Sequence, residues 1–130
     1  MLDKVAYWLE LCEDDLKAAK AMIESENFLW AGFICHLVAE KALKAGVASI
    51  TNEVPPKIHD LAELTVRAEM FDNLSEQQQN LLKELNPLNI EARYPEYKER
   101  IAAKLSFENT VRLLKETEDF LCWIKHRLEK

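Results

Sequence analysis

Arg93, Tyr94 and Pro95 stand together in the stretch LNIEARYPEY, within a sequence that is otherwise typical of helices. Proline biases the residue before it towards extended backbone, so a helix is predicted to end here. A guanidinium can hold a phosphate through two parallel hydrogen bonds, and a phenol can stack or hydrogen-bond. Arg93 and Tyr94 are therefore candidates for the mouth of an anion-binding cleft. The alternative is that Tyr94 packs on the protein and Arg93 pairs with an acid such as Glu40 or Glu91.

A second group of ionisable side chains lies in the stretch AEKALKA, where Lys41 and Lys44 share one face of a predicted helix. They could be phosphate counter-charges across from Arg93, or part of a solvated helix face on which Glu40 pairs with Lys44. His59 could face the same cleft, or cap or pack at the start of a helix. The anion or nucleotide site predicted from these patterns consists of Glu40, Lys41, Lys44, His59, Arg93 and Tyr94.

Other common kinds of site have no support in the sequence. The three histidines lack metal-site spacing from one another. His36 is expected in the core, bonded to a carbonyl, and His126 at a helix C-terminus. Gly32 and Gly46 are the only glycines, too few for a phosphate-binding glycine loop. We therefore expect no metal and no resident cofactor, and any nucleotide would be held by side chains.

Charge and composition limit the partners of the chain. With 23 acidic and 17 basic residues, the net charge of −6 does not favour general nucleic-acid binding. The start of the chain lacks a signal-peptide pattern, and the apolar stretch Phe28 to Ala39 is shorter than the roughly 20 residues of a membrane span. Cys12, Cys35 and Cys122 are interpreted as reduced, buried thiols. These features predict a cytoplasmic protein that does not bind membranes.

The elements that must position the candidate residues are helices. Only 2 glycines and 4 prolines occur in 130 residues, which favours long helices and one all-α domain over residues 1–130. Apolar periodicity predicts helices over Asp3–Glu24, Phe28–Ser49 and His59–Phe71, a fourth after Ser75 and a last one after Ser106.

The second of these helices is apolar around nearly its whole circumference, so it is placed at the centre with Phe33 in the core. Asn27 and Ser106 are predicted N-caps, and Ser75 with Gln78 forms a predicted capping box.

The stretches AEKALKA, IHDLAEL and RYP, together with YWLELCEDDLKAA near the start, resemble the HEPN domain family in order and spacing. The resemblance covers nearly the whole chain. It implies a five-helix, up-and-down type bundle that is commonly dimeric. It also implies a small nucleotidyltransferase as partner, and nucleotide binding has been proposed for the group. Apolar residues including Trp8, Trp30 and Trp123 are in keeping with a homodimer.

Two departures from the family pattern bear on function. Members often carry two glutamines before the Ala-Glu-Lys stretch, whereas this chain has Cys35, His36, Leu37 and Val38. Ribonuclease members carry an arginine followed after four to six residues by a histidine, and no arginine of this chain has one.

The predicted function is a non-catalytic HEPN-type module that can bind a nucleotide and acts with a nucleotidyltransferase in a toxin–antitoxin-like or regulatory pair. One alternative is a divergent ribonuclease toxin whose catalytic set is assembled from Arg93, His59 and lysines. The other is a purely structural dimerisation domain.

Overall fold

A computed structural model describes residues 3–91 and 105–129 of the chain. Within these ranges the protein is all-α, with five helices of seven residues or more: α1 (Asp3–Glu24), α2 (Phe28–Thr51), α3 (Leu61–Arg67), α4 (Glu76–Leu85) and α7 (Phe107–Leu128). A 3-10 turn, η1 (Phe71–Asn73), and a short helix, α5 (Leu88–Glu91), complete the described elements. The five-helix, all-α prediction is confirmed.

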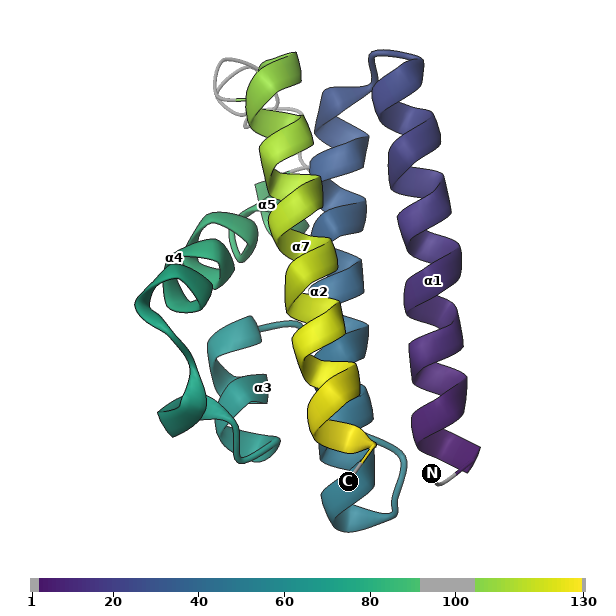
Figure 1. The fold of residues 1–130 in the computed structure, drawn as a ribbon, viewed down its shortest axis with the longest axis vertical. Helices are drawn as coiled ribbons and strands as arrows, with labels where there is room; N and C mark the ends of the chain where they lie inside the picture. Colours follow the sequence, from purple (N-terminus) through teal and green to yellow (C-terminus); the bar gives the residue numbers. More distant parts are fainter. Residues whose placement is uncertain (1–2, 92–104, 130) are drawn as a thin grey trace.

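The three long helices stand side by side, and the short ones cover one flank of them (Figure 1). α1 runs antiparallel to α2 (Figure 1). α7 runs in the same direction as α2, because the chain returns through α3, α4 and α5 towards the end at which α2 begins (Figure 1). α1 lies on one side of α2, and α3, α4 and α5 lie on the other (Figure 1). A side chain on α2 can therefore face either α1 or the short helices.

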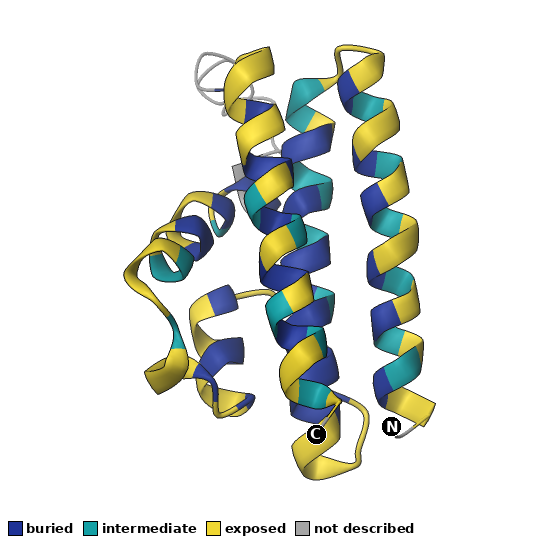
Figure 2. Cartoon of the chain, viewed as in Figure 1, coloured by how far each residue is buried: buried dark blue, intermediate teal, exposed yellow. Residues whose placement is uncertain are grey.

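α2 is the central helix, as predicted. Between Val38 and Ala48 it is buried nearly all round, and dark blue predominates in this part of the helix, while its last turn is exposed (Figure 2). Small side chains let its neighbours approach closely. A Cβ added at Gly46 would stand 2.7 Å from the Met70 side chain and 3.1 Å from the Ala68 Cβ, beyond the end of α3. A larger residue at Gly46 would push this segment away from α2.

Local capping chemistry explains where the helices begin. Ser75 and Gln78 form the predicted capping box at α4, and Ser106 accepts from the Asn109 amide at α7. Asn27 occupies the predicted N-cap position of α2, but its side chain makes no capping bond, and its side-chain amide donates to Ser25 instead. α3 begins at Leu61 rather than at His59, since the Asp60 carboxylate caps it.

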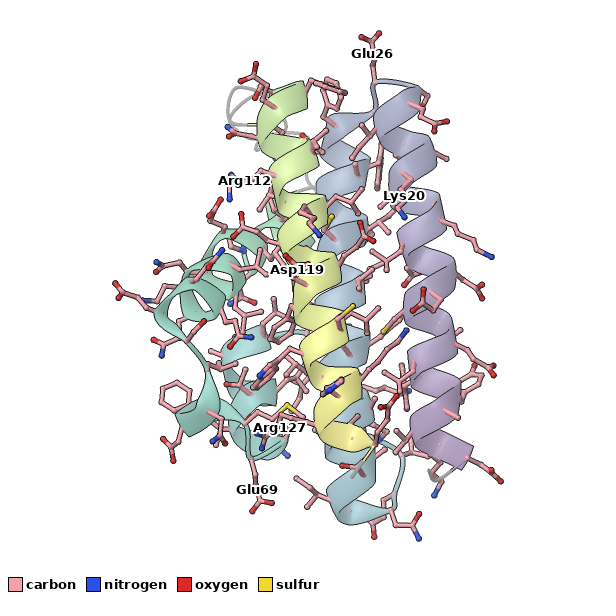
Figure 3. The ribbon with its side chains drawn as sticks, in the orientation of Figure 1. Lys20, Glu26, Glu69, Arg112, Asp119 and Arg127 are labelled. Carbon is pink, nitrogen blue, oxygen red and sulfur yellow. The ribbon has the colours of Figure 1, made fainter. Side chains whose placement is uncertain are left out.

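Three helices end at a non-glycine residue with left-handed backbone: Glu26 (φ 61°), Asn52 (φ 54°) and Glu69 (φ 56°). Glu69 explains why α3 stops at Arg67 and does not continue to Phe71. The side chains of Glu26 and Glu69 point outward at opposite ends of the molecule (Figure 3).

Ion pairs connect the short helices and α1 to α7. The Arg112 guanidinium on α7 donates to Glu84 on α4 at 2.8 Å and to Glu116 on its own helix at 2.6 Å, and these bonds raise the pKa of Arg112. Arg112 extends from α7 on the side of α4 (Figure 3). Lys20 on α1 lies 3.6 Å from Glu118 on α7. Each such exposed pair contributes only about 0 to 1 kcal/mol, so apolar packing carries most of the stability.

Two side chains lie nearer the surface than predicted. Phe33 is half-buried rather than in the core, and its ring meets the exposed Trp30 edge-on at a centroid distance of 5.8 Å. Cys122 is exposed, whereas Cys12 and Cys35 are buried as predicted. Among the described residues, no helix has the length and apolar character needed to cross a membrane.

The thiols provide a direct test of this arrangement. Burial raises the pKa of both Cys12 and Cys35 to about 12, so neither forms appreciable thiolate at pH 8. With a disulfide reagent at pH 8, we expect Cys122 alone to react rapidly in the folded protein and all three thiols to react in denaturant. A Cys122→Ser variant should lose the rapid phase. Fast labelling of Cys12 or Cys35 in the folded protein would contradict this packing.

Candidate functional site

A buried carboxylate, Glu40, lies at the centre of the polar interactions on α2. Its side chain is 6% exposed. Lys44 Nζ donates to Glu40 Oε2 at 2.9 Å, and His59 Nδ1 lies 3.1 Å from both carboxylate oxygens. His36 Nδ1 lies 3.7 Å from Oε1, beyond hydrogen-bonding distance. These four residues, Glu40, His36, Lys44 and His59, are called the Glu40 cluster below.

The helical repeat and one loop bring the cluster together. Residues 36, 40 and 44 are each about one turn apart along α2, so they lie on one face of the helix. His59 comes from the segment between α2 and α3. The His36 ring donates through Nε2 to the His59 carbonyl at 3.1 Å, because a carbonyl can only accept. His36 thus holds the backbone of His59, and Glu40 holds its ring.

The contact with Glu40 fixes the orientation of His59. A carboxylate can only accept, so His59 Nδ1 carries the hydrogen and Nε2 lies at the opposite edge of the ring. The His59 side chain is 50% exposed, whereas that of Glu40 is almost fully buried. Nε2 can accept a hydrogen bond when the ring is neutral and donate one when it is protonated. This arrangement can bind a polar ligand, and a carboxylate-held imidazole is also a common form of general base.

A polar hollow of about 470 Å³ lies beside His59, between the start of α3, the end of α4 and α5. It is lined by His59, Asp60, Lys83, Asn86, Pro87 and Asn89. Asn86 is fixed there, since its amide donates to Asp60 Oδ1 and its oxygen accepts from the Leu61 amide, both at 3.0 Å. Lys83 is exposed and forms no ion pair with any described residue. Its ammonium is the positive charge among the side chains that line the hollow.

The structure brings together only part of the residue set predicted from sequence. Glu40, Lys44 and His59 are in contact. Lys41 is separate from them, because its ammonium bonds Asp15 of α1 at 2.7 Å. Arg93 and Tyr94 lie outside the described residues.

Lys44 also differs from its expected state on a solvated helix face. Its side chain is only 8% exposed. Its ammonium pairs with Glu40 and also lies 5.7 Å from the centre of the Trp8 ring. Lys44 therefore balances an internal charge and is poorly placed to meet a ligand.

Sequence reasoning missed Lys83, Asn86 and Asn89 as residues of the hollow. Asn86 and Pro87 carried a weak signal, since a proline after a helical run marks a break. Asn89 is buried, and Lys83 looks like any exposed helix lysine in the sequence. Only the packing of α4 against the start of α3 gives these residues a shared role.

The Glu40 cluster should contribute strongly to stability. Replacing Glu40 by alanine leaves the Lys44 ammonium buried without its carboxylate, a change that typically costs about 3 to 5 kcal/mol of unfolding free energy. Glu63→Ala is the matched control, because Glu63 pairs with Arg67 at 3.1 Å on the surface and should cost less than about 1 kcal/mol. Urea denaturation measures both.

Adding Lys44→Met to Glu40→Ala should restore part of the lost stability, since the unpaired cation is then removed. Equal unfolding free energies for the Glu40→Ala and Glu63→Ala variants would contradict a buried, cation-paired Glu40.

Comparison with known proteins places the chain in a family. The family model of the HEPN domain matches residues 5–127. Comparisons with curated proteins and with solved structures gave no match. The match includes the Glu40 cluster and nearly all of α1 and α7, so the resemblance carried by AEKALKA and IHDLAEL is confirmed over almost the entire sequence. The chain belongs to the HEPN domain family.

Proposed function

We propose that this HEPN domain is a non-catalytic module that binds a nucleotide in the polar hollow beside His59. In this proposal it acts as a homodimer, together with a small nucleotidyltransferase in a toxin–antitoxin-like or regulatory pair. The observation that carries the binding proposal is the position of His59. Its ring is held by Glu40, its backbone by His36, and its outer half is exposed beside the hollow.

The chemistry of the hollow supports a ligand with an anionic group. Lys83 supplies an ammonium that has no ion-pair partner among residues 3–91 and 105–129, and His59 supplies a nitrogen whose position is fixed in advance. Fixing a binding group before the ligand arrives lowers the entropic cost of binding. The volume of about 470 Å³ lies within the range of roughly 300 to 1,000 Å³ that small-molecule sites occupy.

The proposed binding set differs from the one expected from sequence. Lys41 and Lys44 are engaged with Asp15 and Glu40, so Lys83 takes the role of counter-charge in their place. Glu40 acts through His59 as a positioning residue. Arg93 and Tyr94 remain candidates for additional contacts with the ligand.

One observation favours a ribonuclease as a second candidate. The Glu40–His59 pair has the geometry of a carboxylate that orients a general base, and cleavage of RNA needs such a base for the 2′-hydroxyl. A cation for the developing negative charge is also required, and the arginine spacing of ribonuclease members is absent from this sequence. Binding without cleavage is therefore preferred.

Calorimetric titration with AMP tests the binding proposal. We expect wild type to bind and His59→Ala to bind about tenfold more weakly, the loss of about 1.4 kcal/mol typical of a hydrogen bond to a charged group. His126→Ala, an exposed histidine in the last turn of α7, is the matched control and should bind like wild type. Absence of heat from wild type would contradict nucleotide binding.

The same variants distinguish the second candidate. Incubation with single-stranded and structured RNA should leave the RNA intact for wild type and for both variants. Cleavage by wild type that His59→Ala abolishes and His126→Ala retains would favour the ribonuclease.

Exposed aromatic side chains support the homodimer. Trp30 is 46% exposed at the start of α2, and Phe107 is 57% exposed at the start of α7. The Phe107 ring contacts Phe28 edge-on, with centroids 6.1 Å apart. Of the tryptophans expected to contribute to an interface, Trp8 and Trp123 are partly buried instead. The end of the molecule where α2 and α7 begin is therefore the preferred dimer surface.

Light scattering tests this surface. We expect wild type to have about twice the mass of the 15.1 kDa chain, and Trp30→Glu to be monomeric because a charge in an apolar interface core is strongly unfavourable. Val66→Glu is the control, since Val66 is 60% exposed on α3 at a different surface. A wild-type monomer at high micromolar concentration would count against dimerisation.

A further inference from the structure

An apolar slot of about 100 Å³ opens between α3, η1 and α4. Phe71, Leu74 and Leu82 contribute most of its large apolar side chains. Phe71 is 50% exposed and does not belong to the buried core cluster. Its ring is therefore accessible to a ligand without disturbing the core.

The slot and the polar hollow share a wall. Lys83 in the last turn of α4 and Asn86 at its C-cap line both of them. Asn86 is held rigidly by Asp60 and the Leu61 amide, whereas Lys83 carries a long side chain with no described partner. In this wall Asn86 is therefore fixed, while the Lys83 side chain can adapt. Because both residues line the slot and the hollow, a ligand can contact the two compartments at once.

The two compartments differ in chemistry. The slot offers apolar surface and an aromatic ring, which suit the flat ring of a base. The hollow offers the Lys83 ammonium and the His59 imidazole. Asp60 also lines the hollow, where a carboxylate would repel a phosphate but can accept from sugar hydroxyls.

We propose that the ligand is a mononucleotide seated across this wall, with its base in the slot against Phe71 and its phosphate in the hollow beside Lys83 and His59. The sugar then lies over Asn86 with its hydroxyls towards Asp60. This inference rests on the proposed function and adds to it the orientation of the ligand. Phe71 then distinguishes a nucleotide from a bare phosphate, and Lys83 distinguishes a nucleotide from an uncharged nucleoside.

Calorimetry with AMP on variants of both compartments tests the orientation. Phe71→Ala removes base stacking and should weaken AMP binding about tenfold. Lys83→Gln removes the cation and should weaken it by a similar factor. The controls Tyr7→Ala and Lys17→Gln make comparable changes at exposed positions on α1 and should leave affinity unchanged. Phe71→Leu, which keeps apolar bulk but no ring, should also weaken AMP binding.

Saturation-transfer NMR adds a readout that depends on orientation. With wild type and Lys83→Gln, the adenine protons of AMP should receive the largest share of the transferred signal, and in Phe71→Ala that share should fall relative to the ribose protons. Wild-type AMP binding that Phe71→Ala and Phe71→Leu leave unchanged would overturn this inference alone. Absence of AMP binding to wild type would overturn the proposed function and this inference with it.

Discussion

The buried charge of Glu40 is the constraint on which the arrangement around the hollow depends. A carboxylate that is withdrawn from water needs partners for its charge and its lone pairs. Lys44 supplies the charge from the next turn of α2, and His59 supplies a hydrogen bond from outside the helix. The segment after α2 is thereby tied to the central helix just before α3 begins. The position of α3, and through Asn86 that of α4, follows from this connection.

Most of the fold could be predicted from sequence because its signals are local. The bounds of α1 were predicted as Asp3–Glu24, and the capping box at Ser75 was found from two residues three positions apart. The predicted start of α3, His59, lies two residues before the observed start at Leu61. The difference arises because the contact of His59 with Glu40, nineteen positions earlier, leaves no signal in the sequence. The end of α3 was misplaced because a left-handed glutamate leaves no clear signal in the sequence.

The candidate site could be predicted only in part, for a physical reason. Glu40 and Lys44 are four residues apart on one helix, so their contact follows from the helical repeat. Lys41 is the adjacent residue, and its choice of Asp15 depends on how α1 packs against α2. Lys83 and Asn89 meet in the hollow only through tertiary structure. Patterns along the chain identified residues able to do chemistry, while their grouping depended on which neighbouring helix each one faces.

The pairing of Lys44 with Glu40 also bears on the hydrogen-bonding role of His59. Because the ammonium already balances the Glu40 carboxylate, the cluster does not require a protonated His59. The neutral ring keeps its bond to Glu40 through Nδ1, and protonation adds a hydrogen only at Nε2. The ring can therefore keep its position in both states while its exposed edge changes from acceptor to donor. The nitrogen beside the hollow can therefore meet either a donor or an acceptor of the proposed ligand without rearrangement of the buried residues that hold it.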